Sequence, residues 1–355
     1  TTQIRLVANG IHDPVEDYLV DIRHGNDWRL RAQAMHTNFV YHATGDPWDQ
    51  SAKRWNMNSE LVIAPEAPLR FTLGYDLWQR EGNRIGTRWY SGAIRDTDEP
   101  FEELAQEVYL RVDWDIAPEA TLTLKQAYRW ENWDAAIVDQ DPSPASLDLN
   151  RWTDVTAPVT TALARWTPGR DWVIDGKFVW SPISTETEVQ SRTTGTTSGG
   201  LEEIVFGDVN ADRNFMRGEI AGTYYPDPDW FVTARLEGMQ NLERTDSTFD
   251  TSVQTSALAP PTETTTADVS DRDHRRWRLQ GEAGWRPEAW GAFRLGYEYM
   301  WEEFDREFNI VQTGRVTDET GRMNAWESLT AFRGARILPA DGPAKIVARL
   351  MMPLV

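Results

Sequence analysis

Hydrophobic and polar residues alternate along much of this chain with a period of two. In residues 107–116, Leu110 and Trp114 belong to an apolar set that alternates with charged residues such as Arg111 and Asp113. Successive side chains of a β-strand point to opposite faces of the sheet, so this pattern predicts strands with one apolar and one polar face. The same alternation recurs in residues 121–130, 276–285 and 293–301.

Tight turns rich in Pro, Gly and Asp separate the alternating segments. Proline presets φ and offers no N–H to a neighbouring strand, so it ends a strand. Seven such turns predict about 14 strands joined as hairpins. Longer polar loops are expected on the other side of the hairpins, around residues 132–157, 183–212 and 244–274. The seven turns are 24–27, 64–68, 117–120, 167–171, 226–229, 286–289 and 339–343.

The mean hydropathy of -0.57 is low, and no stretch of about 20 apolar residues could form a membrane helix. A membrane strand is a different matter, because its lipid-facing residues are spread over alternate positions and barely raise the average. Short turns at one end and long loops at the other are typical of outer-membrane β-barrels. The pattern therefore favours a membrane barrel over a membrane helix.

Aromatic residues strengthen this prediction, with 18 Trp, 10 Tyr and 12 Phe. A Trp side chain is satisfied at a membrane interface, where its ring meets hydrocarbon and its N–H meets water. Trp172 and Trp180 are eight residues apart, as are Trp277 and Trp285. At ~3.3 Å per residue and ~40° tilt, that spacing spans roughly 20 Å, near the ~25 Å apolar band of such barrels.

Two aromatic girdles are therefore predicted. A soluble β-sandwich is the alternative, but its core would favour Val, Ile and Leu over rows of Trp. The short-turn girdle comprises Trp28, Trp114, Trp172, Trp230 and Trp285, and the far girdle, at the far ends of the strands, comprises Trp55, Trp130, Trp180, Trp277 and Trp301.

The fold class expected is all-β: one transmembrane antiparallel barrel of about 14–16 strands, covering residues 1–355 as a single domain in the bacterial outer membrane. Segments such as ALARWTPGRDWVIDGKFVW and LQGEAGWRPEAWGAFRLGYEYMWEEFDREF resemble hairpins of Gram-negative outer-membrane porins. They also resemble the barrels that partner periplasmic multihaem cytochromes. The resemblance implies a barrel fold and, in the second case, a cytochrome partner. With no Cys in the chain, any covalently attached haem would belong to that partner.

The polar faces of the strands are expected to line the lumen. Such residues can bias permeation through a water-filled pore, or form cross-strand ion pairs that stiffen the wall. If a partner fills the lumen, the same charges become an interface. The predicted lining residues are Arg70, Asp76, Arg111, Asp113, Lys125, Arg129, Asp175, Lys177, Arg217, Arg235, Glu237, Arg294 and Glu298.

The net charge of -20 argues against nucleic acid as a partner. Part of this charge is expected in loops at the mouth of the barrel, at Glu202, Glu203, Asp246 and Asp250. An acidic vestibule of that kind predicts a weak preference for cations that fades as salt screens it.

Two weaker patterns suggest other chemistry. Asp208, Asn210 and Asp212 place oxygen ligands at every second residue, as calcium loops do, but Arg213 occupies the position where such loops need Gly. A solvated polar loop is the favoured interpretation, with loosely bound Ca²⁺ as the alternative. Asp271, Asp273 and His274 crowd the start of a strand near the predicted rim, as in outer-membrane proteases of barrel type.

The leading hypothesis is a porin that allows passive passage of small polar solutes or ions. The alternative is a barrel sheath that holds a periplasmic multihaem cytochrome or docks another envelope protein. A surface hydrolase is the third and least favoured hypothesis, since the sequence offers no catalytic motif and predicts no enzyme. The partners expected are the lipid bilayer and, for a sheath, the cytochrome.

Overall fold

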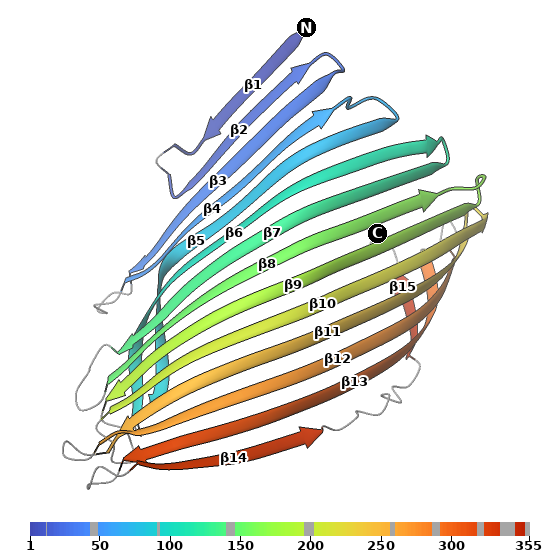
Figure 1. Ribbon diagram of the computed structural model, residues 1–355. Coiled ribbons are helices and arrows are strands. Elements are labelled where there is room, and N and C mark those ends of the chain that lie inside the picture. Colours follow the sequence, from blue (N-terminus) through green and yellow to red (C-terminus); the bar gives the residue numbers. More distant parts are fainter. Residues whose placement is uncertain are drawn as a thin grey trace.

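The computed structural model describes residues 1–11, 13–42, 49–90, 93–139, 146–194, 202–255, 260–285, 292–317, 323–333 and 345–351. These residues form 15 β-strands in one antiparallel sheet (Figure 1). No helix in the described part of the chain is long and apolar enough to span a membrane. The all-β prediction and the predicted strand number are confirmed.

From β1 to β14 the strands follow one another across the sheet in chain order, each paired with the next, and β15 pairs with β13. Their bounds are β1 (Thr2–Asn9), β2 (Val15–His24), β3 (Trp28–His42), β4 (Asp49–Ile63), β5 (Leu69–Tyr90), β6 (Ala93–Ala117), β7 (Ala120–Asp139), β8 (Ser146–Trp166), β9 (Trp172–Thr194), β10 (Glu202–Asp227), β11 (Trp230–Gln254), β12 (Thr262–Trp285), β13 (Ala292–Thr317), β14 (Met323–Arg333) and β15 (Lys345–Met351).

Six of the seven predicted turns join strands that pair as hairpins: β2–β3, β4–β5, β6–β7, β8–β9, β10–β11 and β12–β13. Residues 286–289 lie outside the described residues, but Trp285 and Phe293 on either side are register partners. Gly25 and Gly169 have positive φ angles of 51° and 76°, which glycine adopts without steric cost. The positions of these six short turns are therefore predicted correctly from the sequence.

The seventh predicted hairpin, at residues 339–343, is wrong. β14 and β15 do not pair with each other; both pair with β13, at Glu307–Thr317 and Ala292–Glu298 respectively. They run in the same direction along β13, so they are two segments of one strand position. Residues 339–343 themselves lie outside the described residues. The sequence pattern indicates a reversal of the chain between these two segments, whereas both run antiparallel to β13.

The strands run much further than the sequence pattern suggested at the end opposite the short turns. Most of 183–212 and 244–274, expected as loops, belongs to β9, β10, β11 and β12. Thr and Val favour strands even in polar segments, and hydroxyl pairs such as Thr153–Thr187, 3.1 Å apart, link neighbouring strands there. At ~3.3 Å per residue, the 26 residues of β10 extend over roughly 85 Å.

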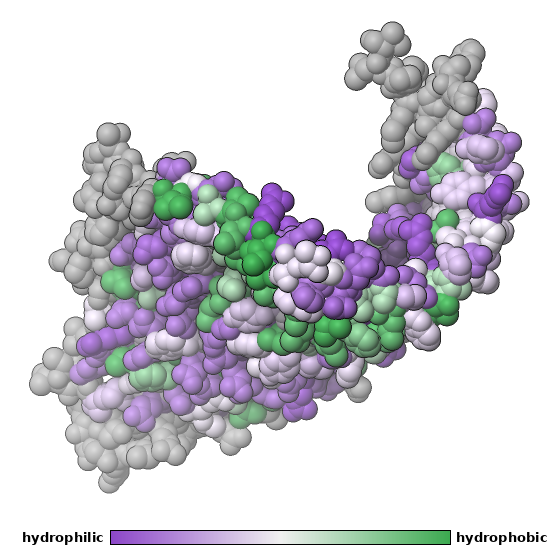
Figure 2. Space-filling model, turned by 90° about the horizontal axis from the view of Figure 1, so that it is seen from above, coloured by the Kyte–Doolittle hydropathy of each residue, from purple (hydrophilic) through white to green (hydrophobic). Residues whose placement is uncertain are grey.

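The two faces of the sheet differ in the way the sequence predicted. The outer face carries exposed apolar side chains, with Leu110 50% and Leu295 59% exposed. The inner face carries charged and small residues and the most buried positions, such as Tyr109 at 4% and Glu237 at 3%. Figure 2 shows the sheet bent into a trough, with hydrophobic residues in a band between two polar regions. Exposed apolar and sheltered polar surface is the reverse of a soluble protein.

A single row of register partners shows how the strands tilt. The row starts at Trp28 on β3, directly beside a short turn. Ten strands further across the sheet it reaches Trp301 on β13, which lies eight residues along the strand from Phe293 at the β12–β13 turn. Eight residues at ~3.3 Å over ten steps of ~4.8 Å give a tilt of roughly 30°. The row is Trp28, Ile63, Phe71, Val112, Leu124, Ala162, Phe178, Gly218, Gly238, Trp277 and Trp301.

The described pairing does not close the sheet. β1 pairs with β2 at one edge, and β14 and β15 pair with β13 at the other. The two edges lie at opposite sides of the sheet in Figure 1. Within the described residues, the chain is thus a continuous curved wall.

Candidate functional site: the inner polar face

All of the residues predicted to line the lumen lie on the inner face. Alternation along each strand places them there together with the buried Tyr109 and Glu237. Register brings distant segments into contact, as when Lys177 of β9 pairs with Glu219 of β10. The inner face therefore brings together charged residues from strands that are far apart in the sequence.

Ion pairs across β10 to β12 form a connected network. Glu237 lies at its centre, with one carboxylate oxygen 3.0 Å from Arg217 and the other 2.9 Å from Arg276. Arg217 also lies 3.6 Å from Glu219, which pairs with Arg235 at 3.2 Å. Two cations thus hold the most buried carboxylate of this face, and the pairing offsets the cost of burying its charge.

A further network of contacts lies on β12 and β13, toward the short turns. Arg278 donates to both carboxylate oxygens of Glu298, at 3.0 and 2.9 Å, and Gln280 donates to the same group at 2.8 Å. Arg294 lies 3.3 Å from Glu282 on the neighbouring strand. Each contact crosses between neighbouring strands, so the network ties β12 to β13 along the wall.

A second group of contacts spans β4 to β7. Arg111 lies 3.0 Å from Asp113 and 3.8 Å from Glu60. Lys125 pairs with Glu107 at 2.5 Å. The Tyr109 hydroxyl donates to Glu60 at 2.5 Å, and its ring covers Gly74 on β5, where an added Cβ would lie 2.1 Å from Cζ.

Four other predicted lining residues are also paired. Arg70 makes a bidentate contact with Asp115, at 2.6 and 3.1 Å. Arg129 pairs with Glu131, Asp76 accepts a hydrogen bond from Asn58, and Asp175 lies 3.8 Å from Arg165. Partly exposed cross-strand pairs of this kind contribute about 0.2–1 kcal/mol each, so their value to the wall is collective.

The list of predicted lining residues leaves out several members of this face, although the alternation puts most of them on polar strand faces. Glu60, Glu107, Asp115, Arg276 and Arg278 all complete ion pairs with predicted residues. Their positions alternate in step with the predicted residues on the same or adjacent strands. The period of two is enough to place such residues on the polar face, whereas knowing which of them pair requires the register.

The predicted girdle residues lie on strands with the spacing expected. Trp114, Trp172, Trp230 and Trp285 are exposed beside short turns. Trp172 stacks on Tyr224 at 4.6 Å, and Trp230 stacks on Trp285 at 5.6 Å. Such stacking holds the rings against the sheet surface.

The far girdle lies within the strands and not at their ends, because the strands continue beyond it. Trp55, Trp180 and Trp277 are exposed on the outer face, and Trp180 donates its indole N–H to Asn214 at 2.9 Å. Trp130 and Trp301 are half-buried in β7 and β13. With a tilt of roughly 30°, the eight-residue spacing separates the girdles by roughly 23 Å.

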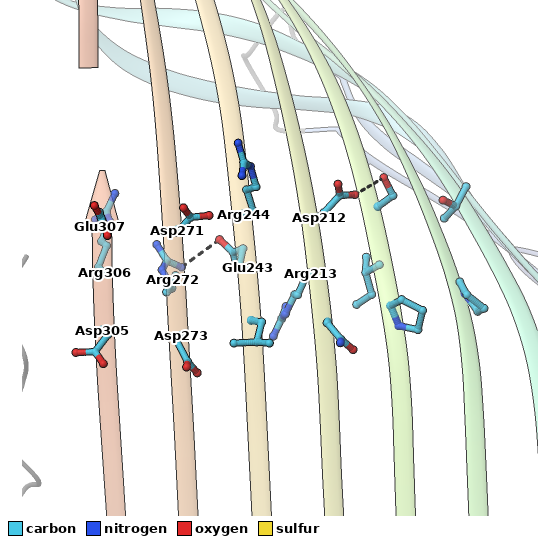
Figure 3. A pocket seen from close by; sticks show the side chains of 17 residues that line it. Asp212, Arg213, Glu243, Arg244, Asp271, Arg272, Asp273, Asp305, Arg306 and Glu307 are labelled. Atoms are coloured by element: carbon cyan, nitrogen blue, oxygen red, sulfur yellow. Dashed lines mark hydrogen bonds and ion pairs between the residues drawn. The ribbon is translucent and has the colours of Figure 1, made fainter. Parts of the chain in front are cut away.

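Beyond the far girdle the outer face becomes acidic. A groove of about 790 Å³ crosses β8 to β13 there, and Figure 3 shows Asp212, Arg244, Asp271, Asp273 and Asp305 along it. Within it, the Ser184 hydroxyl donates to Asp212 at 2.9 Å. Asp246, 3.3 Å from the Arg244 guanidinium, raises the pKa of Arg244, so this cation stays charged among the carboxylates. The groove offers a negative surface outside the apolar band.

The acidic vestibule expected from the sequence is misplaced. Glu202, Asp246 and Asp250 lie in extended strands, on the same outer face as Leu236 and Ile220. Only Glu203 of the four faces inward by alternation. The expected cation preference therefore loses its physical basis, because most of these carboxylates point away from the lumen.

The residues of the calcium-loop pattern lie in a strand and not in a loop. Asp208, Asn210 and Asp212 lie inside β10, where alternate residues are about 6.6 Å apart along an extended chain. They cannot wrap around one ion as a loop does. No group of three or more His, Asp or Glu side chains in the described part of the chain is arranged to hold a metal.

The residues that resembled a protease rim are separated by the sheet. Asp271 and Asp273 lie on the outer face, whereas His274 alternates to the inner face and bonds to Glu302 at 2.5 Å. Asp273 pairs instead with Arg275. These groups do not form one site, since the strand backbone lies between them.

Comparison with known proteins gives distant structural likenesses. The siderophore receptor PiuA from Acinetobacter baumannii has a TM-score of 0.47 at 8% identity, over 92% of this chain and 74% of that chain. The ferric yersiniabactin uptake receptor FyuA from Yersinia pestis has 0.48 at 11%, over 92% and 65%, so this chain spans less than two thirds of it. The toluene transporter TodX from P. putida has 0.33 at 9%, over 88% and 92%.

No family model and no curated protein sequence matches the chain. The structural likenesses are too distant to indicate a substrate. The assignment of the fold comes from the molecule itself: an antiparallel meander, an exposed apolar band between two rows of Trp, and a polar inner face. In a bilayer only helices and closed barrels satisfy every backbone group. This is the wall of an outer-membrane β-barrel protein.

Proposed function

We propose that this chain forms the wall of an outer-membrane channel through which small polar solutes or ions pass passively. The observation that carries the proposal is the inner face, which carries charged residues on every strand from β5 to β13. Its charges are arranged as ion pairs half-open to water, such as Arg235–Glu219 and Arg294–Glu282. A face of this kind stabilises a water-filled space and would be costly against hydrocarbon.

Conductance tests the proposal directly. Purified, folded protein should produce stepwise conductance in a planar bilayer. The chain has no Cys, so single cysteines can be placed without background. A charged, membrane-impermeant thiol reagent should change the conductance of Lys177→Cys, on the inner face, and leave that of Leu236→Cys, on the outer face, unchanged. Folded protein that never conducts would contradict the proposal.

A sheath around a periplasmic multihaem cytochrome is the second candidate. The height of the wall favours it, since 26-residue strands tilted by roughly 30° rise roughly 75 Å, well beyond a bilayer's apolar band of ~25 Å. A passive pore does not need so tall a wall. A sheath should co-purify with a protein that has a haem absorption band, and should stay closed to ions while the partner is bound.

We propose no catalytic role. The hydrolase hypothesis rested on Asp271, Asp273 and His274, which the strand divides between two faces. Ca²⁺ held loosely by the acidic outer surface stays a prediction.

A further inference from the structure

Two glycines that are direct register partners, Gly218 of β10 and Gly238 of β11, open a groove on the outer face. The groove encloses about 430 Å³. Its outer-face walls are Met216, Ile220, Leu236 and Trp277. The backbone of two strands thus forms its floor, because neither glycine has a side chain of its own.

The two glycines are not equivalent. At Gly238 an added Cβ would lie 2.7 Å from Cζ3 of Trp277, so the indole ring leans over this glycine. At Gly218 an added Cβ would meet nothing within 4 Å. The open part of the groove therefore lies over Gly218, beside the Trp277 ring.

The groove lies within the surface that faces the bilayer. Gly218, Gly238 and Trp277 are consecutive members of the row of partners that ends at the far girdle. Ile220 and Leu236, on the side toward the short turns, are exposed apolar residues. On the other side the groove ends at Gln240 and Arg275, where the outer face becomes polar. The groove is therefore continuous with the apolar band and meets the headgroup level at one end.

We propose that this groove binds one acyl chain of a membrane lipid, with the lipid headgroup at the level of Gln240 and Arg275. An unfilled groove would leave the atoms of its walls without dispersion partners on one side, and a flexible hydrocarbon chain can fill it. A flat sheet from a second copy would fit poorly, because the exposed Trp277 and Phe178 rings stand on either side of the glycine pair. The proposal rests on the outer face lying in a bilayer.

Photo-crosslinking tests the site. The protein is reconstituted in nanodiscs of phosphatidylethanolamine that carries a diazirine on one acyl chain, and the labelled peptides are mapped by mass spectrometry. Label should concentrate on 216–220 and 236–240 relative to other exposed apolar segments such as 108–112. Gly218→Leu fills the groove and should reduce label at 236–240 several-fold.

Gly222→Leu is the matched control, because Gly222 lies on the same face and strand, also in open space, but outside the groove. It should leave the labelling unchanged. Both variants should keep the gel mobility of the folded protein. Label spread evenly around the band, or equal in the two variants, would overturn the site while leaving the channel proposal intact. Disulfide-linked dimers of Gly218→Cys would assign the groove to a second copy, and no label anywhere would refute the membrane location itself.

Discussion

At the scale of single residues, glycine and aromatic side chains fit together across neighbouring strands. In four register pairs, the ring of one residue occupies the space that a Cβ of its glycine partner would need. The pairs are Gly74–Tyr109, Gly207–Phe249, Gly238–Trp277 and Gly284–Phe231. These positions explain why glycine appears inside strands, where it is otherwise unfavourable.

Gly74→Ala tests this fit. The new Cβ must displace the Tyr109 ring and weaken its hydrogen bond to Glu60, so unfolding in urea should become easier by about 1–3 kcal/mol. Gly222→Ala, where a Cβ meets nothing within 4 Å, is the control and should change stability little. Equal effects of the two substitutions would show that loss of glycine alone matters.

Leu110→Arg and Arg111→Leu test the direction of adjacent side chains. Leu110 is 50% exposed on the outer face, so a charge there should cost about 2–4 kcal/mol in the bilayer and reduce insertion. Arg111 faces inward and pairs with Asp113, so its replacement should impair insertion far less. The measurement is the folded fraction in isolated outer membranes. Similar losses for both variants would indicate a fold buried on both faces.

At the scale of elements, the sequence predicts the short-turn half of the sheet well and the other half poorly. Turns such as 117–120 and 226–229 were identifiable because proline and glycine act locally on φ. The sequence pattern predicts loops where β9 to β12 continue, because Ser and Asp are typical of loops and outweigh the strand preference of Thr in these segments. The register that assembles the ion pairs depends on pairing between distant segments.

Labelling of whole cells tests the orientation of these elements. Glu188→Cys lies on β9 beyond the far girdle, and Glu119→Cys lies at the β6–β7 turn. An impermeant maleimide should react with the first on intact cells and with the second only after the cells are lysed, because short turns of such barrels face the periplasm. The opposite result would invert the sheet in the membrane.

At the scale of the whole molecule, charge is divided between the two surfaces. The inner face balances cations with carboxylates, as around Glu237, whereas the outer face beyond the far girdle is rich in Asp and Glu. The net charge of -20 therefore describes the outside of the extended strands more than the lumen. A whole-chain charge could not reveal this division, since it depends on which way each strand residue points.

Ion selectivity follows from that division. Charges further than ~8 Å from the permeating ion are screened at physiological salt, so inward groups should dominate. Arg235→Glu should shift the reversal potential across a salt gradient toward cations, whereas Asp250→Lys, on the outer face, should leave it nearly unchanged. A larger effect from Asp250→Lys would support the hypothesis of an acidic vestibule and contradict the dominance of the inward groups.

The change from apolar to acidic residues on the outer face occurs within one or two rows of the sheet. Trp277 is followed, two residues toward the far end of β12, by Arg275, and then by Asp273 and Asp271. Sinking the wall by one residue pair would carry carboxylates toward hydrocarbon, and raising it would lift Trp277 and Trp301 of the far girdle into water. The boundary between apolar and acidic residues on the outer face therefore fixes how deep the protein lies in the bilayer, independently of what passes through it.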